Sequence, residues 1–336
     1  QHRPSLIIPS RRRPRAPCRQ HMGTIAEIWV YPVKACGGVR VPSARVGKTG
    51  LALDRAFCIV DTEGTVVFVG EAISQRKLPN LATINCALST DQSELTLAAP
   101  GMHAITVPTA IEAYTKAPEM QVHASGASTT TGGGWKLGSL TCHVHEKASA
   151  WLTEYLNRDN TDDPGRRMSG KSKASKFALA RAPPDGLAMS SYEPVFPLIE
   201  KALADPAYTA RFAGNAKLFS DFAPFLLTNA RSAEATAKLA GVRSFPINAR
   251  SNLVVEARRG AWAEEKWASI AVAPKGGGPP LALTKIKVLK KTFPGKWADP
   301  EWGSWAGVYY GVYFGHAGVE GATLAEGDEI VVLKET

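Results

Sequence analysis

Two short segments near the beginning of the chain place cationic side chains where they could bind an anion. In residues 31–38, YPVKACGG, the proline ends an expected strand and the paired glycines let the backbone approach a ligand, so Lys34 is presented at a strand end. Residues 50–55, GLALDR, place Asp54 and Arg55 just before the next expected strand. Arginine donates bidentately to phosphate and lysine binds it as a point charge, so these segments predict a phosphate site. The alternative is a structural Asp54–Arg55 ion pair and a surface lysine.

A third segment matches a phosphate-binding motif in form only. Residues 165–172, GRRMSGKS, satisfy the pattern G-x-x-x-x-G-K-S. Such a loop cradles phosphate only where a buried strand leads into it, and residues 157–164, NRDNTDDP, are too polar for a buried strand. We therefore predict a chance match in an exposed loop. The lysine face of residues 285–291, KIKVLKK, could also meet phosphates, but such a face more often is solvated or protects a sheet edge.

Metal-ligating residue types are present without the spacing of a metal site. His143 and His145 point to one face of an expected strand, yet no third ligand accompanies them, so we predict a packed or solvated strand face. The five cysteines lack a C-x-x-C pair and none follows Cys142. This pattern argues against a disulfide framework or structural zinc and favours a reducing, cytoplasmic compartment.

The positive charge is concentrated at the beginning of the chain. The formal net charge is +10, and six arginines but no acidic residue precede Met22. We predict a disordered basic arm over residues 1–22, which is either a targeting segment, with a mitochondrial location, or sequence upstream of a start at Met22. The remaining chain carries too small an excess to predict a specific nucleic-acid partner. No apolar run approaches the ~20 residues that a membrane span requires.

The elements that must position these residues fall into two groups. Residues 23–145 read as short strands, with hairpins expected for 56–61 with 65–69 and for 82–88 with 94–97, and a strand over 140–145. A helix follows, because apolar residues recur at helical spacing. Its apolar stripe consists of Ala148, Trp151, Leu152, Tyr155 and Leu156. We expect this helix and mobile loops, over 146–215, to connect the first domain to a second, over 216–335.

The second group alternates expected helices and strands. Helices are predicted over 195–204 and 232–239, and strands over 253–256, 281–289 and 329–333. Residues 126–134 and 160–175 lack a periodic apolar face and are predicted to be exposed loops. The size and composition are those of an ordinary globular protein, and we predict a monomer.

Eight segments in this order share a pattern with one family. They are YPVKAC at 31–36, GLALDR at 50–55, WLTEYL at 151–156, FAPFLLTN at 222–229, RSNLVV at 250–255, GAWAEEKW at 260–267, FG at 314–315 and GDEIVV at 327–332. Together they resemble the two-part MOSC family, named for the C-terminal domain of molybdenum cofactor sulfurase and including the mitochondrial amidoxime-reducing components. The ordered set is more specific than any single member.

The resemblance implies a fold and a binding site. The fold would be α+β, an N-terminal β-barrel-like domain joined to a mixed α/β MOSC domain that contains a β-barrel. A molybdenum cofactor, bound through its pterin (molybdopterin), would lie in a cleft between the domains; pyridoxal phosphate binding is a further association of the family. Lys34 and Arg55 would reach the cofactor's phosphate from the N-terminal domain. The phosphate and pterin would be held from the other side by Thr228, Arg250 and Asn252.

This chain departs from the family at the expected metal ligand. Where competent members carry C-x-R-C, residues 285–288 read KIKV, so no thiolate stands there. Molybdenum favours soft thiolate sulfur, and an ammonium group is not an equivalent ligand. Cys36 is the nearest family position with a thiol, Ala35 replaces a usual serine, and Asn248 stands where an arginine often lies. The sequence therefore assigns no metal ligand and no catalytic residue.

Two functions follow from these expectations. The first is binding of a molybdenum cofactor, with reduction of small N-hydroxylated or N-oxide substrates if the metal is retained. Electrons would then come from an external haem or flavin protein, because the chain has no redox motif of its own. The second is a non-catalytic binding protein that keeps the anion site but has lost the metal. Both predict that Lys34, Arg55, Arg250 and Asn252 converge on one cleft.

Overall fold

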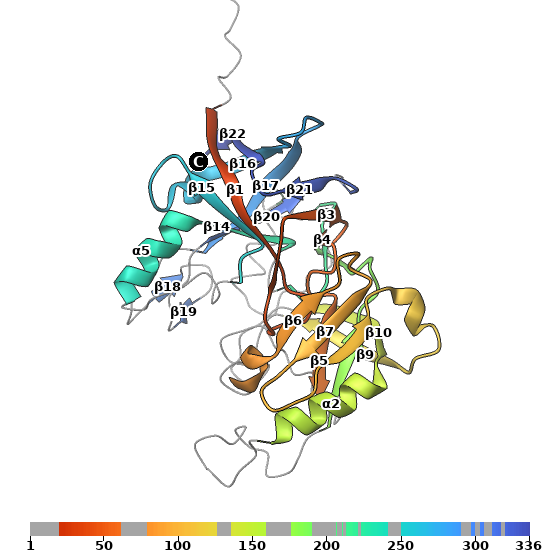
Figure 1. Ribbon diagram of the computed structural model, residues 1–336. Helices are drawn as coiled ribbons and strands as arrows, with labels where there is room; N and C mark the ends of the chain where they lie inside the picture. Colours follow the sequence, from red (N-terminus) through yellow and green to blue (C-terminus); the bar gives the residue numbers. More distant parts are fainter. Residues whose placement is uncertain are drawn as a thin grey trace, which may run out of the picture.

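The structure is a computed structural model of the 336-residue chain (Figure 1). It describes residues 20–61, 79–125, 136–158, 176–189, 206, 210, 213–220, 223–240, 250–289, 297–299, 303–305, 311–316 and 320–336. Several predictions lie outside these residues. They are the strand over 65–69, the helix over 195–204, the loops over 126–134 and 160–175, the motif at 165–172, and residues 1–19 of the arm.

The strands of the second half form a closed barrel around one apolar core. Going round the barrel, the strands are β15 (Leu253–Ala257), β14 (Phe225–Asn229), β20 (Gly311–His316), β17 (Leu281–Leu289), β16 (Trp267–Ala273), β22 (Glu329–Glu335) and β1 (Gln20–Val30). The pairing of β1 with β15 closes the ring, and β2 (Val39–Val41) extends it beside β1. β14 and β15 are parallel, and the other neighbours are antiparallel. The predicted strands over 253–256, 281–289 and 329–333 are thereby confirmed.

The strand that closes the barrel comes from the beginning of the chain. β1 begins inside the predicted basic arm, and Met22 and Ile25 lie in the barrel core. The backbone of β15 passes so close to Gly23 that a Cβ atom there would lie 2.2 Å from the carbonyl oxygen of Glu256. A glycine is therefore required where the two strands meet. The barrel thus unites residues from both ends of the sequence.

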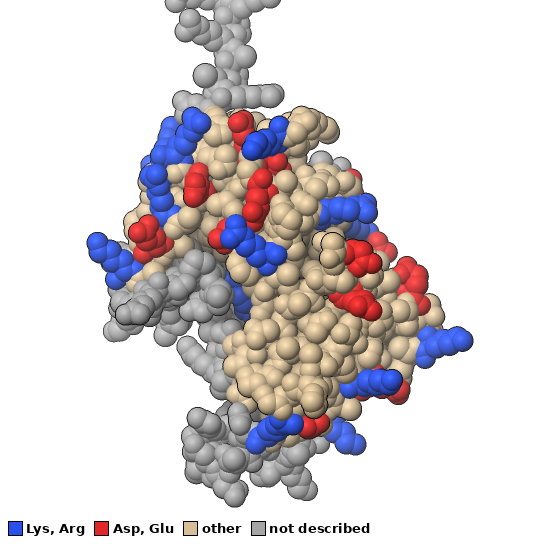
Figure 2. Space-filling view, in the orientation of Figure 1, with Lys and Arg blue, Asp and Glu red and all other residues tan. Residues whose placement is uncertain are grey.

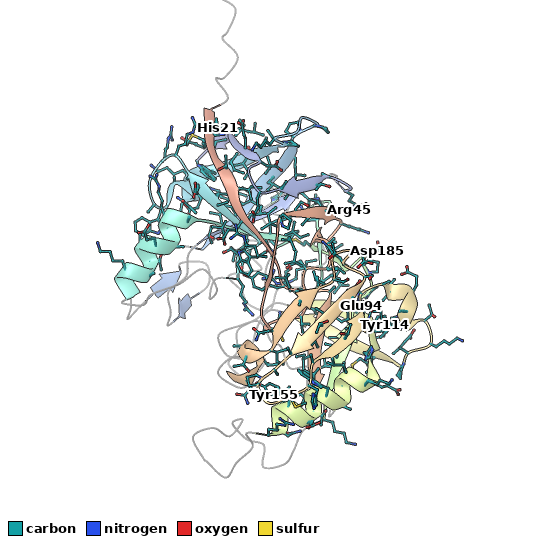
Figure 3. All side chains as sticks on the ribbon, in the orientation of Figure 1. His21, Arg45, Glu94, Tyr114, Tyr155 and Asp185 are labelled. Atoms are coloured by element: carbon teal, nitrogen blue, oxygen red, sulfur yellow. The ribbon has the colours of Figure 1, made fainter. Side chains whose placement is uncertain are left out.

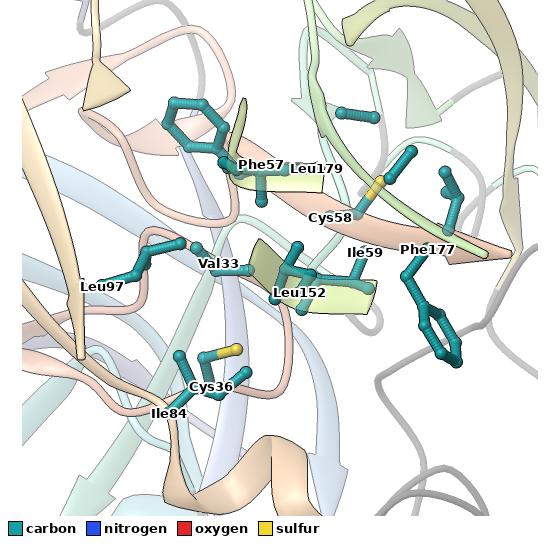
Figure 4. Close-up of a cluster of buried hydrophobic side chains, with 14 of the residues drawn as sticks. Val33, Cys36, Phe57, Cys58, Ile59, Ile84, Leu97, Leu152, Phe177 and Leu179 are labelled. Atoms are coloured by element: carbon teal, nitrogen blue, oxygen red, sulfur yellow. The ribbon is translucent and has the colours of Figure 1, made fainter. Parts of the chain in front are cut away.

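A second core lies below the barrel in Figure 1. One of its sheets has the order β5 (Phe57–Asp61), β11 (Phe177–Arg181), β10 (Lys136–Val144) and β9 (Glu119–Ser125). The other has the order β6 (Asn85–Leu88), β7 (Glu94–Ala98) and β8 (Ile105–Pro108), and its β6–β7 hairpin confirms the prediction. Figure 4 shows Phe57 and Leu97 from these strands in one buried cluster with Leu152, which lies in the helix that follows β10. We call this unit the first module.

The helix α2 (Glu146–Asn157) belongs to the first module. Its five buried residues are the predicted apolar stripe, and all five belong to the module's core, where the helix packs beside β11. The stripe is therefore confirmed. The burial explains why a helix of 12 residues is stable, since short helices depend on tertiary packing.

The remaining elements are short. They are β3 (Ser43–Gly47), β4 (Gly50–Leu51), β12 (Leu187–Ala188), β13 (Ala216–Lys217), β18 (Trp297–Asp299), β19 (Gly303–Trp305), β21 (Thr323–Ala325), the α-helix α5 (Ala230–Ala240) and the 3-10 helices η1 (Pro79–Thr83), η2 (Ile111–Tyr114) and η5 (Ala263–Lys266). α5 confirms the helix predicted over 232–239 and packs beside β14 and β15. Over the described residues the fold is mostly β with a closed barrel, so the helical share is smaller than the predicted α+β class implies.

Candidate functional site

The candidate site lies where the barrel meets the first module. β1 ends at Val30, and the next residues pass into the first module, where Val33 bridges to Phe57. On the barrel side, residues 250–252 lead into β15, whose Leu253 pairs with Ile28 of β1. Polar residues gather at this point, and we call them the junction cluster. Its members are Tyr31, Lys34, Asp54, Arg55, Arg250 and Asn252.

Main-chain hydrogen bonds hold Lys34 and Arg55 on two adjacent segments. The Arg55 amide donates to the carbonyl of Tyr31 at 2.7 Å, and the Lys34 amide donates to the carbonyl of Phe57 at 2.9 Å. Both side chains are buried, with exposed fractions of 5% for Lys34 and 8% for Arg55. A surface lysine, one part of the alternative interpretation, is therefore wrong. Two buried cations in adjacent segments create a positive environment that suits an anion.

Asp54 is the centre of the junction cluster. Its two carboxylate oxygens each lie 2.7 Å from Nη1 of Arg55, and its Oδ1 accepts a bond from the amide of Tyr31 at 2.9 Å. Asn252 also donates from its side chain to this carboxylate. Burial raises the pKa of Asp54, and the guanidinium of Arg55 opposes that rise. The structural Asp54–Arg55 ion pair considered from the sequence is therefore present.

Arg55 also connects the first module to the barrel. Its Nη2 donates to the main-chain carbonyl of Arg250 at 3.0 Å, across 195 positions of sequence. Its guanidinium lies over the ring of Tyr31, 4.4 Å from the ring centroid. Burial raises the pKa of Tyr31 to about 12, although Arg55 and Arg250 both act against the rise. Tyr31 and Asp54 are thus parts of the cluster that the sequence did not assign to the site, although the motifs around them contain both.

Asn252 has a framework role at the start of β15. Its Oδ1 accepts from the amide of Leu226 at 3.2 Å, and its Nδ2 donates to the carbonyl of Trp29 at 3.3 Å. With the bond to Asp54, the amide joins β14, β1 and the turn before β5. These contacts, together with that of Arg55 to Arg250, support the predicted convergence of Arg55, Arg250 and Asn252.

The backbone of the junction is unusually rich in left-handed conformations. Six described residues other than glycine have positive φ, and four lie here: Ala35, Leu53, Arg55 and Arg250, with φ of 67°, 64°, 51° and 51°. Such conformations cost of order 1 kcal/mol each and tend to gather at functional sites. The hydrogen bonds of the cluster hold the chain in these conformations.

Thr228 lies in β14, beside this hydrogen-bond network. It is buried in β14 opposite Val254, two residues beyond Leu226, whose amide and carbonyl bond Asn252. A Cβ atom at Gly311 would lie 2.9 Å from its Cγ2, so the neighbouring strand packs closely against it. The described contacts thus place Thr228 beside the cluster and not within its hydrogen bonds.

The described cysteines lie in or against the core of the first module. Cys36, Cys58 and Cys142 are buried in it, and Cys86 packs against it. Burial raises the pKa of the Cys36 thiol, which Figure 4 shows among Val33, Ile84 and Leu97. A protonated thiol in an apolar core is a poor metal ligand. Among the described residues, no group of three or more His, Cys, Asp or Glu side chains could hold a metal ion.

Lys285, at the expected position of the metal-binding cysteine, is bound at the end of the barrel where β1 begins. Its ammonium donates at 3.0 Å to the carbonyl of Glu265 and at 3.0 Å to Oγ1 of Thr336. The C-terminus lies near the start of β1, an end that His21 marks in Figure 3. The junction cluster follows the other end of β1.

The visible surface shows no area of one charge sign. Figure 2 shows Lys and Arg interspersed with Asp and Glu over the described part of this face. Mixed charge of this kind is typical of a solvated surface. No helix among the described residues is both long and apolar enough to span a membrane.

Comparison with known proteins agrees with the resemblance seen in the motifs. Residues 22–159 match the family described as MOSC N-terminal beta barrel domain. Mitochondrial amidoxime reducing component 2 of Bos taurus is 27% identical over 191 residues, which cover 55% of this chain and 51% of that protein. Mitochondrial amidoxime-reducing component 1 of Homo sapiens is 28% identical over 195 residues, with coverage of 55% and 51%.

A molybdenum cofactor sulfurase is also similar over a shorter stretch. The protein of Danio rerio is 27% identical over 135 residues, which cover 40% of this chain and 14% of that protein. The chain thus spans about half the length of the first two relatives. Residues 22–159 thus match the MOSC N-terminal beta barrel family, and the chain is similar to the mitochondrial amidoxime-reducing components and the molybdenum cofactor sulfurases.

Proposed function

We propose that the protein binds a pterin-type molybdenum cofactor through its phosphate at the junction cluster. The observation that carries this proposal is the contact of Arg55 with the main chain of Arg250, 195 positions away in sequence, together with buried Lys34 on the segment adjacent to Arg55. Arginine and lysine side chains bind phosphate oxygens through charge-assisted hydrogen bonds, so cationic residues gathered at one point support a phosphate site. The relatives named for a molybdenum cofactor or for amidoxime reduction support the same cofactor class.

The residues present fit a phosphate group. Lys34 and Arg250 would supply positive charge to it, while Thr228 would line the adjoining strand, as the resemblance implies. The hydroxyl of Ser251, next to Arg250, is buried and has no hydrogen-bond partner among the described residues. An unsatisfied buried hydroxyl costs about 1–3 kcal/mol, so a ligand oxygen that bonded it would bind more tightly.

The residues present fit a molybdenum ion less well than they fit the phosphate. The position expected to hold a thiolate carries Lys285, whose ammonium is bound to Glu265 and Thr336. This observation favours the second candidate function, a binding protein that keeps the cofactor's phosphate and pterin but does not ligate molybdenum. If metal is retained, the cofactor would supply two-electron transfer to a small N-hydroxylated substrate, with electrons from an external haem or flavin protein.

One purification distinguishes these functions. The full chain would be isolated from a host that makes the cofactor, and its pterin content and molybdenum content would be measured separately. Pterin with near-stoichiometric molybdenum would support the oxidoreductase, and pterin without molybdenum would support the binding protein. Absence of pterin, together with no binding of added inorganic phosphate, would overturn the proposed function.

A further inference from the structure

Two of the cysteines lie on segments of the first module that are hydrogen-bonded to each other. Cys36 closes a turn, in which its amide donates to the carbonyl of Val33 at 3.2 Å. The next residue, Gly37, donates to the carbonyl of Ile84 at 2.8 Å, so this turn lies against the start of β6, which carries Cys86. Figure 4 shows the Cys36 side chain beside Ile84.

The two segments approach each other closely. A Cβ atom at Gly37 would lie 3.4 Å from the Cα atom of Asn85, the residue before Cys86. The main chain of Val33, which accepts the amide of Cys36, also hydrogen-bonds the sulfur of Cys86. Cys86 contributes to the raised pKa of the Cys36 thiol, so the two sulfurs interact. Two cysteines that flank such a main-chain contact can meet the disulfide requirement that their Cα atoms lie within about 7 Å.

The other two described cysteines provide a contrast. Cys58 and Cys142 also interact electrostatically, and burial raises the pKa of both thiols. However, β11 lies between β5 and β10, the strands that carry them. Neighbouring strands lie about 4.8 Å apart, so cysteines two strands apart have Cα atoms separated by about 9 Å or more. This separation is too large for a disulfide bond, whose Cα atoms lie within about 7 Å.

We propose that Cys36 and Cys86 form a redox modification site, which an oxidant closes into a disulfide between the turn over 33–36 and β6. The reaction with a small disulfide such as oxidised glutathione proceeds in two exchanges. The thiolate of the half-buried Cys86 attacks the small disulfide and releases one thiolate, and the thiolate of Cys36 then attacks the Cys86 sulfur and releases the second. Two protein thiols are thereby oxidised, their two protons pass to the released thiolates, and one small disulfide is reduced to two thiols.

The disulfide would fix the turn that carries Lys34. Lys34 lies inside this turn, and Ala35, between it and Cys36, has a φ of 67°. Burial raises the pKa of Cys86 to about 12 and raises that of Cys36 as well, so little thiolate is present near neutral pH. The pair should therefore remain reduced in a reducing compartment and close slowly under sustained oxidation. This site is independent of the proposed function, because its formation needs no bound ligand.

The experiment treats the full-length Cys18→Ser protein with an excess of oxidised glutathione, because Cys18 lies outside the described residues. Its peptides are then mapped by mass spectrometry without reduction. We expect a peptide in which Cys36 and Cys86 are cross-linked, while the other two described cysteines remain thiols. A cross-link between those other two would overturn the inference. A persistent glutathione adduct on Cys86, or two unmodified thiols after prolonged incubation, would overturn it as well.

Thermal unfolding provides a second measurement, in which each protein is compared with its own reduced form. A disulfide that encloses about 50 residues restricts the unfolded chain, so the oxidised protein should unfold about 5–10 °C higher than the reduced protein. Addition of dithiothreitol should reverse this rise. In the same Cys18→Ser background, Cys86→Ala should abolish the rise and Cys142→Ala should keep it. An equal rise in both variants, or a rise in neither, would contradict a bond between Cys36 and Cys86.

Discussion

Lys285 stands at the position where the resemblance predicts a metal-binding cysteine. Its ammonium is bound by Glu265 and Thr336, and a cysteine there would lose both hydrogen bonds. We predict that Lys285→Cys lowers the free energy of unfolding by about 1–3 kcal/mol, because bonds from a charged donor are lost. If the position corresponds to the family's metal ligand, the same variant gains molybdenum when isolated from a cofactor-producing host, since a soft sulfur completes the metal's coordination.

Lys285→Ser is the control for this prediction. It loses the same hydrogen bonds and supplies no thiolate, so its unfolding should match that of the cysteine variant while its molybdenum content stays at the unmodified level. Equal molybdenum in both variants would contradict the assignment. Ile286→Cys and Val288→Cys test a shift of the alignment by one or three residues. Strong reductase activity in the unmodified protein would show that the metal is held without a cysteine at this position.

At the scale of the element, α2 begins with an unusual cap. Nδ1 of His145 accepts a hydrogen bond from the amide of Ala148 at 3.2 Å, which requires the nitrogen to be unprotonated. Burial lowers the pKa of His145, and Lys147 acts in the same direction. The folded pKa lies below the unfolded value, so the cap's stabilisation is present above the unfolded pKa of about 6.5 and is lost as the pH falls below it.

The pH dependence of this cap can be measured by comparing variants. His145→Asn supplies an uncharged capping oxygen, so its stability between pH 7 and pH 5 should fall by less than that of the unmodified protein, by about 1 kcal/mol. His145→Ala removes the cap and should cost a similar amount at pH 7. Denaturant unfolding at the two pH values measures both effects. Parallel pH profiles for the asparagine variant and the unmodified protein would rule out the proposed titration.

The contact of β1 with β15 depends on one glycine. A Cβ atom at Gly23 would lie 2.2 Å from the Glu256 carbonyl oxygen, which belongs to backbone and cannot turn aside. Gly23→Ala should therefore separate the strands that close the barrel and lower the free energy of unfolding by about 2–3 kcal/mol. Gly276→Ala, where no atom lies within 4 Å of the added carbon, should have little effect. Similar unfolding curves for both variants would show that the strands move apart without cost.

At the scale of the whole molecule, the two ends of the chain meet in one barrel. Deleting residues 1–19 removes all six arginines that precede Met22 and leaves β1 complete. Most salt-dependent binding to heparin should then disappear, because such binding scales with the number of cations engaged. Extending the deletion to residue 30 removes the strand that closes the barrel, so that variant should fail to fold. Unchanged heparin binding after the shorter deletion would reveal a basic surface on the folded body.

Local sequence patterns were enough to predict the helices and strands that depend mainly on neighbouring residues along the chain. The apolar stripe of α2, the β6–β7 hairpin and the bounds of β17 follow from periodicity and turn residues, since each depends on neighbours along the chain. The ordered motifs likewise supported the family resemblance, and they identified Lys34, Arg55 and Arg250 as cationic candidates for the site. These features needed no knowledge of the fold.

Only the tertiary structure decided how these parts work together. The pairing of β1 with β15, the contact of Arg55 with Arg250 and the central place of Asp54 join residues far apart in sequence. No local pattern records such contacts, because strand register and side-chain partners are chosen by packing between distant segments. The same sequence motif, Asp54 followed by Arg55, is compatible with a ligand site or with a framework. The hydrogen bonds of the folded chain show that Asp54 and Arg55 are part of the framework that joins the first module to the barrel.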